Sequence, residues 1–255
     1  MLVDAHCHLD FAQFDDDRQA MFARAEEAGV VHFIVPGTTR AGWPSVLRMS
    51  ERNAVSVGLG LHPCFMNEHR EEDLETLESM LDEHAHLVAL GECGIDARFS
   101  ETLDDQWHFF DAQLRLAKSR KLPVVIHCVH ADDKVSKRLK QLDLPAGGLI
   151  HAFTGSPEQA EKFIELGYKV GLGGSVTYER AQRVRRMVAT LPDDGYVLET
   201  DSPDMPLCGY QGQRNEPARI AQVAAVVAEL RHQSVEQVAA DSTANAKRLF
   251  RLEEL

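Results

Sequence analysis

The chain has 255 residues, of which 44% are hydrophobic and 26% charged, a composition typical of a globular protein and not of a disordered or fibrous one. Its formal net charge of -13 argues against a protein that coats nucleic acid, because such binding depends on basic side chains. Five widely spaced cysteines predict a protein without disulfides in a reducing compartment. Without a recognisable leader sequence or an apolar run of the roughly 20 residues that span a membrane, we expect a cytoplasmic protein without membrane contact. The sequence does not allow a stable protein partner to be predicted.

Short apolar runs alternate with longer segments of helical periodicity along the whole chain. The apolar runs predict strands at residues 2–6, 30–35, 55–59, 87–91, 124–127, 148–151, 169–172 and 196–200. The clearest helices are predicted at 102–120, at 156–167 with a Ser-Pro-Glu start, at 216–230 and at 235–250. This alternation predicts one α/β domain over residues 1–255, a (β/α)8 barrel of the TIM type.

An open doubly wound sheet is the alternative fold, but the GxGxxG or P-loop that usually follows its first strand is missing. Gly171-Leu172-Gly173-Gly174 follows the seventh predicted strand, a place where barrels often bind phosphate. We expect a tight turn in which these glycines adopt positive φ angles, with a phosphate cradle as the alternative.

Ionisable side chains stand at the ends of five predicted strands. His6 and His8 end the first strand and, being two residues apart, face the same side, with Asp4 below them. The others follow buried runs, where an unpaired charge is costly; they are Glu92, His127, His151 and Asp201. Because barrel enzymes carry their active residues at the carboxyl ends of the strands, we expect all six to meet in one barrel mouth.

Four histidines and two carboxylates suit a pair of divalent ions such as Mg, Mn, Zn, Ni or Fe. Glu92 comes from the middle of the barrel order and is the expected bridging carboxylate. The ions would polarise the scissile bond and lower the pKa of a water, whose proton Asp201 could accept while also binding one ion. Glu199 faces the same side as Asp201; it either orients a ligand or is a buried acid paired with a neighbouring Lys or Arg.

A series of motifs in chain order carries a family resemblance. They are Asp4-Ala5-His6-Cys7-His8-Leu9-Asp10, Leu59-Gly60-Leu61-His62-Pro63, Gly91-Glu92-Cys93-Gly94-Ile95-Asp96, Pro123-Val124-Val125-Ile126-His127, His151-Ala152-Phe153-Thr154-Gly155, Glu199-Thr200-Asp201-Ser202-Pro203 and Arg214-Asn215-Glu216-Pro217. Together they resemble the TatD family of metal-dependent deoxyribonucleases, which are amidohydrolase-like barrels. The stretch from Asp204 to Gln213 is similar to the YjjV-like subgroup.

The resemblance implies hydrolysis of phosphodiester bonds in DNA, with two divalent ions held by His6, His8, Glu92, His127, His151 and Asp201. His62, within one of the motifs, is a candidate for binding substrate or orienting a ligand. The chain departs from the family pattern at Cys64, where a histidine is frequent, and at Cys128-Val129-His130, where Ser-Arg is frequent. Because arginine binds phosphate through paired hydrogen bonds, its loss leaves the substrate preference open.

The sequence thus predicts a metal-dependent hydrolase that acts on DNA or nucleic-acid fragments. An amidohydrolase-like enzyme for an amide, lactone or ester is the alternative, although many such barrels use a carboxylated lysine where this chain has Glu92. A metal-bound scaffold without activity is disfavoured by the complete ligand set and the candidate base.

Four cysteines stand beside the predicted ligands. Cys7, Cys93 and Cys128 each adjoin a ligand within a strand, so we expect their side chains to point away from the pocket and pack against helices. Cys64 lies in a predicted loop, where this alternation does not apply.

Overall fold

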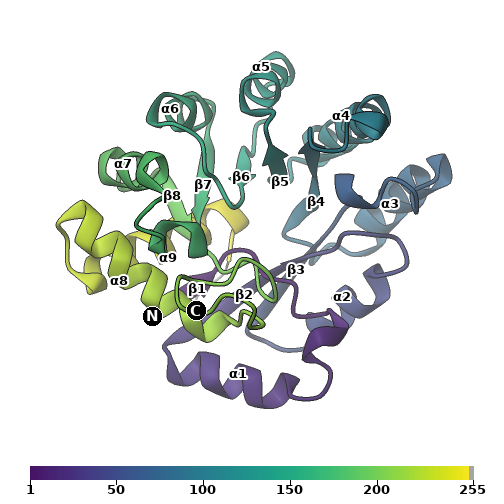
Figure 1. Cartoon of the computed structure of the whole chain (residues 1–255). Helices are drawn as coiled ribbons and strands as arrows, with labels where there is room; N and C mark the ends of the chain where they lie inside the picture. Colours follow the sequence, from purple (N-terminus) through teal and green to yellow (C-terminus); the bar gives the residue numbers. More distant parts are fainter. Residues whose placement is uncertain (253–255) are drawn as a thin grey trace.

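Parallel strands form one sheet in chain order within residues 1–252, the part of the chain that this computed structural model describes. In that part there are eight: β1 (Leu2–Asp4), β2 (Val30–Pro36), β3 (Val55–Leu59), β4 (Ala89–Asp96), β5 (Val124–Val129), β6 (Gly148–Ile150), β7 (Tyr168–Leu172) and β8 (Tyr196–Leu198). The sheet closes where the Ala5 N–H donates a hydrogen bond of 3.0 Å to the Leu198 carbonyl. Figure 1 looks into the barrel and shows helices around the strands. The predicted TIM-type barrel is confirmed.

The helices follow the strands in alternation. They are α1 (Arg18–Glu27), α2 (Trp43–Met49), α3 (Glu71–Glu83), α4 (Leu103–Arg120), α5 (Asp132–Leu142), α6 (Pro157–Glu165), α7 (Gln182–Thr190), α8 (Ile220–Arg231) and α9 (Val235–Phe250). The helices predicted at 102–120, 156–167 and 235–250 are confirmed, and Ser156 caps α6 by accepting a hydrogen bond from the Gln159 N–H. The helix predicted at 216–230 begins later, because a 3-10 turn (Pro217–Arg219) precedes α8. Within residues 1–252, no helix has the length and apolar character needed to cross a bilayer.

The strand boundaries differ from the prediction where the barrel mouth begins. β4 and β5 continue beyond the predicted ends and stay paired as far as Asp96 and Val129. Glu92, expected just after its strand, therefore lies within β4, and His127, expected as the last residue of its strand, is followed by two more residues of β5. β1 and β8 end earlier than predicted, and beyond them the Asp201 N–H donates to the His6 carbonyl over 2.9 Å.

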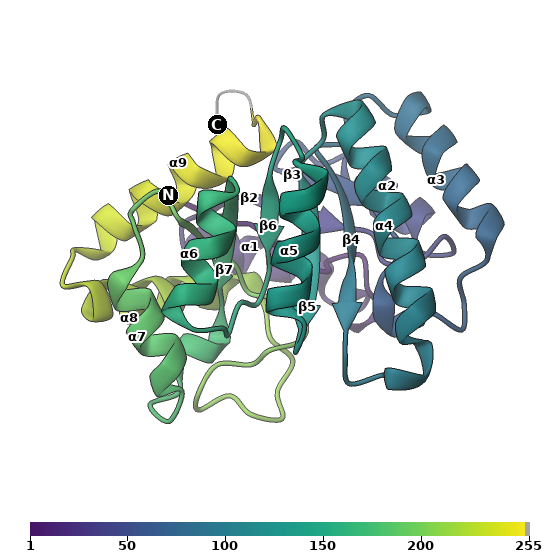
Figure 2. The same cartoon turned by 90° about the horizontal axis from the view of Figure 1, so that it is seen from above.

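The amino-terminal end of the barrel is filled by apolar side chains. Inward-facing residues from six strands pack in one cluster with three residues of α9; the cluster comprises Val3, Ala5, Ile34, Ala89, Val125, Leu149, Val197, Ala246, Leu249 and Phe250. Figure 2 shows α9 crossing this end, while the long loop after β8 lies at the opposite end. The carboxyl ends of the strands are thus left to form the site. The last residues of the predicted domain, 253–255, lie outside the described part.

The glycine-rich segment at 171–174 is not the predicted turn with positive φ angles, since none of its glycines has one. A Cβ on Gly171 would instead lie 2.5 Å from Cδ of Glu199. Because Gly171 has no side chain, it leaves room for the side chain of Glu199, which directly follows the neighbouring strand β8. The absence of a side chain, and not backbone freedom, is what this position requires.

Candidate metal centre

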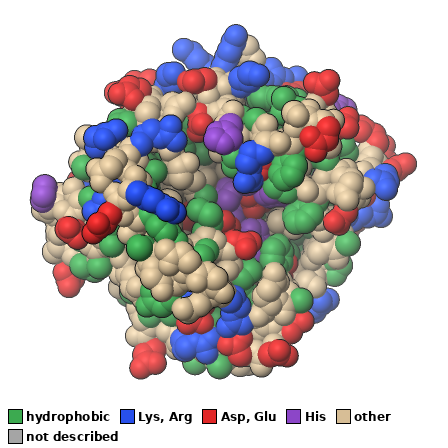
Figure 3. Space-filling model, in the orientation of Figure 1, with side chains coloured by type: hydrophobic (Ala, Val, Ile, Leu, Met, Phe, Trp, Pro, Cys, Tyr) green, Lys and Arg blue, Asp and Glu red, His purple; other side chains and the backbone are tan. Residues whose placement is uncertain are grey.

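The six predicted ligands meet at the carboxyl end of the barrel. The cavity at this end measures about 220 Å³ and is lined by His8, His62, Glu92, His127, His151 and Asp201 among others, with His6 fully buried beneath it. Figure 3 shows histidine and acidic side chains at the bottom of a hollow on this face, with lysine and arginine side chains on its rim. The structure therefore brings the six side chains together, while their role as metal ligands stays a prediction.

One group of side chains surrounds Oε2 of Glu92. This oxygen lies 3.3 Å from Nε2 of His6 and 3.2 Å from Nε2 of His8. Oδ1 of Asp201 completes the group at 3.3 Å from the same nitrogen of His6. Asp201 has a left-handed backbone (φ 55°), a strained conformation that its hydrogen bond to the His6 carbonyl maintains.

A second group surrounds the other oxygen of Glu92. Oε1 lies 2.7 Å from Nε2 of His151 and 3.3 Å from Nδ1 of His127. His62 also reaches this oxygen, with its Nε2 at 2.8 Å. Glu92 therefore stands between two sets of ligand atoms and offers one oxygen to each.

The spacing and pairing of these atoms fit cations. Two ligands at about 2.0–2.2 Å from one tetrahedral ion are about 3.3–3.6 Å apart, close to the separations in the first group. Both Glu92 oxygens are buried without a well-directed hydrogen bond among the described residues. A buried carboxylate is costly unless a cation compensates it. The residues present thus fit two divalent ions that share Glu92.

The pKa shifts of the buried side chains are consistent with binding of cations in this cluster. Burial opposes ionisation of Glu92, yet the surrounding histidines, His62 first, hold its pKa well below the usual range. Burial lowers the pKa of His151 to about 4, which keeps its imidazole neutral, the form that binds metals. Burial also acts to lower the pKa of His6, but Glu92 and Asp201 outweigh it and raise the pKa well above its ordinary value. An ion that binds at His6 must therefore release a proton.

Glu199 lies behind this cluster and is fully buried. Its Oε1 accepts a hydrogen bond of 2.5 Å from the Ala152 N–H and lies 3.9 Å from Nδ1 of His151. Burial raises its pKa to about 8. No Lys or Arg is among its polar partners in the part of the chain described here, so the alternative of a Lys or Arg pair is wrong. The carboxyl group lies beside His151 without a hydrogen bond to it, so its role in orienting a ligand stays a prediction.

Asp96 is a site residue that the sequence reasoning did not assign. Its Oδ2 lies 3.0 Å from Nε2 of His127, on the ring edge opposite the nitrogen that faces Glu92. Arg98 holds the same carboxylate through Nε, at 2.9 Å from Oδ1. Such a carboxylate fixes the orientation and tautomer of a metal-binding histidine. The alternation of strand side chains could have indicated it, since Asp96 follows Glu92 by four residues in β4.

The cysteines divide as expected. Cys7 and Cys93 are buried in the core between the strands and the helices, and Cys128 packs against that core. Their predicted orientation away from the pocket is confirmed. Cys64 lies instead at the mouth, where its Sγ approaches Oδ2 of Asp96 at 3.5 Å.

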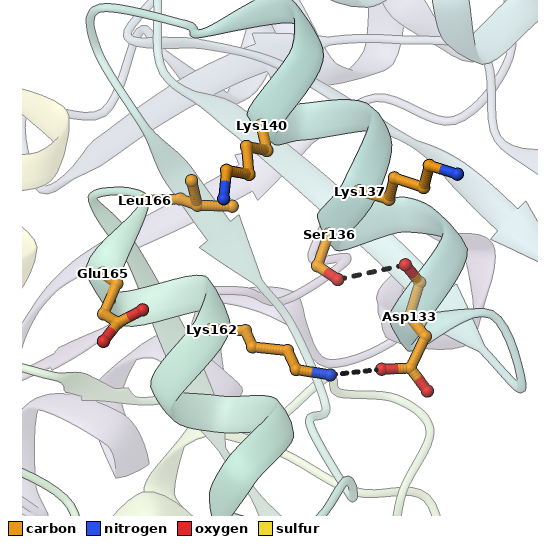
Figure 4. Close-up of a pocket in the computed structure, with 7 residues that line it drawn as sticks. All are labelled: Asp133, Ser136, Lys137, Lys140, Lys162, Glu165 and Leu166. Atoms are coloured by element: carbon orange, nitrogen blue, oxygen red, sulfur yellow. Dashed lines mark hydrogen bonds and ion pairs between the residues drawn. The ribbon is translucent and has the colours of Figure 1, made fainter.

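A larger groove, of about 550 Å³, lies on the outer surface between α5 and α6. Figure 4 shows its lysines and the ion pair between Lys162 and Asp133, which measures 2.9 Å. The lysines and Asp133 are exposed, and none of the candidate ligands lines this groove. The candidate ligands therefore lie in or beneath the smaller cavity of the barrel mouth and not in this groove.

The chain resembles known proteins over nearly its whole length. The family model described as TatD related DNase matches residues 3–251. The chain is 42% identical over 251 residues to the metal-dependent hydrolase YjjV of Escherichia coli K12, with 97% of each chain covered. The crystal structure of YjjV matches with a TM-score of 0.95 over 98% of both chains. A protein of Pantoea sp. (strain At-9b) named 3'-5' ssDNA/RNA exonuclease TatD is 33% identical over 260 residues, which cover 98% of this chain and 100% of that one.

Proposed function

The chain belongs to the TatD family of metal-dependent hydrolases, and we propose that it hydrolyses phosphodiester bonds in DNA or short nucleic-acid fragments with two divalent ions. The family expected from the motifs is thus confirmed, as is the class of metal-dependent hydrolase. The substrate proposal draws support from the relative in Pantoea, whose name describes an exonuclease on single-stranded DNA and RNA.

The division of the two Glu92 oxygens between separate ligand groups is the observation that carries the proposal. Oε2 would serve an ion together with His6, His8 and Asp201, and Oε1 would serve an ion together with His127 and His151. These nitrogen and oxygen ligands accept Mg, Mn, Zn, Ni or Fe. Ions bound there would polarise the phosphodiester and lower the pKa of the attacking water.

The protein's own side chains then hold the reacting groups and move the proton. Burial acts to raise the pKa of Asp201, but the hydrogen bond to His6 and the charges of the surrounding histidines together lower it, so its carboxylate is charged at neutral pH and can accept a proton from water. Its side chain remains 15% exposed and therefore reaches the cavity. Asp96 orients His127 through a contact of 3.0 Å, and Glu199 lies 3.9 Å from His151, where a small shift on metal binding would let it orient that ring. His62 faces the cavity beside Glu92.

Aromatic side chains on the cavity wall favour a nucleic-acid substrate. Phe11 stacks on His8 with ring centroids 4.8 Å apart, and Phe65 lies 5.6 Å from the His62 ring. Both line the cavity and are partly exposed. Nucleobases stack on such rings without regard to sequence, which suits an enzyme that binds short fragments or strand ends.

The proposal is tested with 5'-labelled single-stranded and duplex DNA, incubated with purified protein and Mg²⁺ or Mn²⁺ and then with a chelator. We expect metal-dependent shortening of the DNA that chelation stops. His6→Ala and Asp201→Asn should lower metal content or abolish shortening, whereas His86→Ala, an exposed histidine away from the mouth, should change neither.

Two results would contradict the proposal. Full metal content and full rate in both site variants would refute the ligand assignment. Absence of DNA shortening together with turnover of a lactone or a dihydroorotate-like amide would instead support the alternative hydrolase on the same barrel.

A further inference from the structure

A third group of potential ligands lies on one side of the barrel mouth, next to the two already described. His62 and Cys64 come from the segment after β3, while Asp96 and His127 come from β4 and β5. One ligand atom each of His62, Cys64 and His127 lies within 4.8 Å of the others. Cys64 introduces a sulfur ligand that the two proposed ion positions lack.

The separations in this group match a small tetrahedral ion. With metal–sulfur and metal–oxygen bonds of about 2.3 and 2.0 Å, the two ligands of such an ion are about 3.5 Å apart. Sγ of Cys64 and Oδ2 of Asp96 are 3.5 Å apart. Nε2 of His127 lies 3.0 Å from the same oxygen, near the about 3.3 Å expected of nitrogen and oxygen ligands.

The ligand types select the kind of ion. Thiolate prefers soft or borderline ions such as Zn²⁺ and Cd²⁺ over Mg²⁺ or Mn²⁺. Asp96 is also held by Arg98, whose side chain is 57% exposed and can turn to solvent when a cation takes its place. The other cysteines do not compete for this position, because Cys7 and Cys93 are buried in the core, Cys128 packs against it, and Cys208 is exposed on the loop after β8.

His127 connects this group to the catalytic one. Its Nδ1 faces Glu92 and His151, and its Nε2 faces Asp96. A neutral imidazole offers one lone pair, so His127 can serve one ion at a time. An ion bound beside Cys64 therefore withdraws His127 from the ion position that Glu92 and His151 form.

We propose that Cys64, Asp96 and His127, with His62 in reach, form a separate soft-cation site whose occupation by Zn²⁺ or Cd²⁺ inhibits the enzyme. On binding, a metal–sulfur bond forms and the thiol proton passes to solvent, with no change of oxidation state. Only the inhibition rests on the proposed function; the binding of the ion does not.

Binding is tested by adding Cd²⁺ or Co²⁺ to the metal-free protein and recording the thiolate-to-metal charge-transfer absorption in the ultraviolet. We expect the band in the wild type and in Cys208→Ser, and its loss in Cys64→Ser and Cys64→Ala, with chemical unfolding curves to verify that each variant is folded. Removing the competing cation in Arg98→Gln should tighten binding. No band in the wild type at saturating ion, or an unchanged band in Cys64→Ser, would overturn the site.

Inhibition is tested by adding Zn²⁺ to protein assayed on DNA with Mn²⁺. Each rate is expressed relative to the same protein without Zn²⁺. Cys64→Ser should need at least about tenfold more Zn²⁺ than Cys208→Ser for half inhibition, the smallest effect usually seen when a group around a metal is lost. Equal sensitivity of the two variants would refute the inhibition. A protein inactive on DNA with every metal would refute the proposed function, and the spectra would still decide the site.

Discussion

Replacement of Gly171 by alanine should disturb the candidate metal centre through Glu199, although Gly171 itself carries no chemistry. The new Cβ would lie 2.5 Å from Cδ and 2.9 Å from Oε1 of Glu199, well inside the about 3.5–4.0 Å of ordinary carbon contacts. Glu199 is fully buried, and its Oε1 holds the hydrogen bond from the Ala152 N–H. The carboxyl group therefore cannot withdraw without disturbing that bond.

The expected cost has two parts. Overpacking a buried site destabilises by about 1–3 kcal/mol, and disturbing a buried hydrogen bond costs about 1–3 kcal/mol more. Gly171→Ala should therefore lower the free energy of unfolding by about 2–6 kcal/mol in urea denaturation. Its hydrolysis rate should fall as well, because Glu199 would no longer face His151 in the same position.

Gly173 offers a matched control two residues along the same segment. A Cβ there would meet nothing closer than 3.4 Å, and the backbone is extended (φ -122°, ψ -153°). Gly173→Ala should change the free energy of unfolding by no more than about 1 kcal/mol. In a Glu199→Ala background the cost of Gly171→Ala should shrink to the same level. Equal costs for the two glycines in the wild-type background, or an undiminished cost without Glu199, would refute the reasoning.

Three further predictions concern other parts of the structure. Phe250→Ala should lower the free energy of unfolding by about 3–5 kcal/mol, because Phe250 packs in the apolar cluster that fills the amino-terminal end of the barrel. Val235→Ala at the exposed start of α9 should lower it by less than about 1 kcal/mol. Urea denaturation measures both. Asp96→Asn should weaken metal binding by about 10–100-fold in a chelator competition, because His127 loses its orienting carboxylate, and unchanged affinity would exclude that role. Burial lowers the pKa of His32 to about 4, so the folded state resists the protonation that the unfolded chain accepts near 6.5, and stability falls as pH drops from about 6.5 to about 4. In metal-free protein, this fall in the free energy of unfolding should be up to about 3 kcal/mol smaller for His32→Gln than for the wild type. If both proteins lose the same stability over this pH range, His32 does not contribute.

The barrel could be predicted because hydrophobic runs and helical periodicity depend only on residues close together in the chain, and strands and helices form where these patterns lie. The joint position of His6, His151 and Asp201 also followed, since strand ends of a barrel must meet at one face. Glu92 and His127 were expected at strand ends but lie inside β4 and β5, because pairing between these strands continues past the point where their apolar pattern stops.

Tertiary contacts explain what the sequence could not show. Nothing near Gly171 in the chain indicates that Glu199, 28 residues later, fills the space above it. The partner of Glu199 is the backbone N–H of Ala152, which no side-chain pattern reveals. The approach of Cys64 to Asp96 likewise joins a loop to a strand whose side chains become neighbours only in the folded barrel.

A protein with an acidic surface can bind a polyanionic substrate if the positive charge that attracts the substrate is confined to the site. Two divalent ions would exceed the negative charge of Glu92 and Asp201, and Glu199 adds little, since burial raises its pKa to about 8. Because the whole chain has a net charge of -13, attraction should act on one or two phosphates and not on a long stretch of backbone. For single strands each phosphate contact contributes about -0.7 to the slope of log affinity against log salt. We therefore expect a slope shallower than about -2 when DNA affinity is measured with increasing salt at fixed Mn²⁺. A steep slope, equivalent to six or more phosphates, would mean that a basic surface outside the mouth holds the DNA.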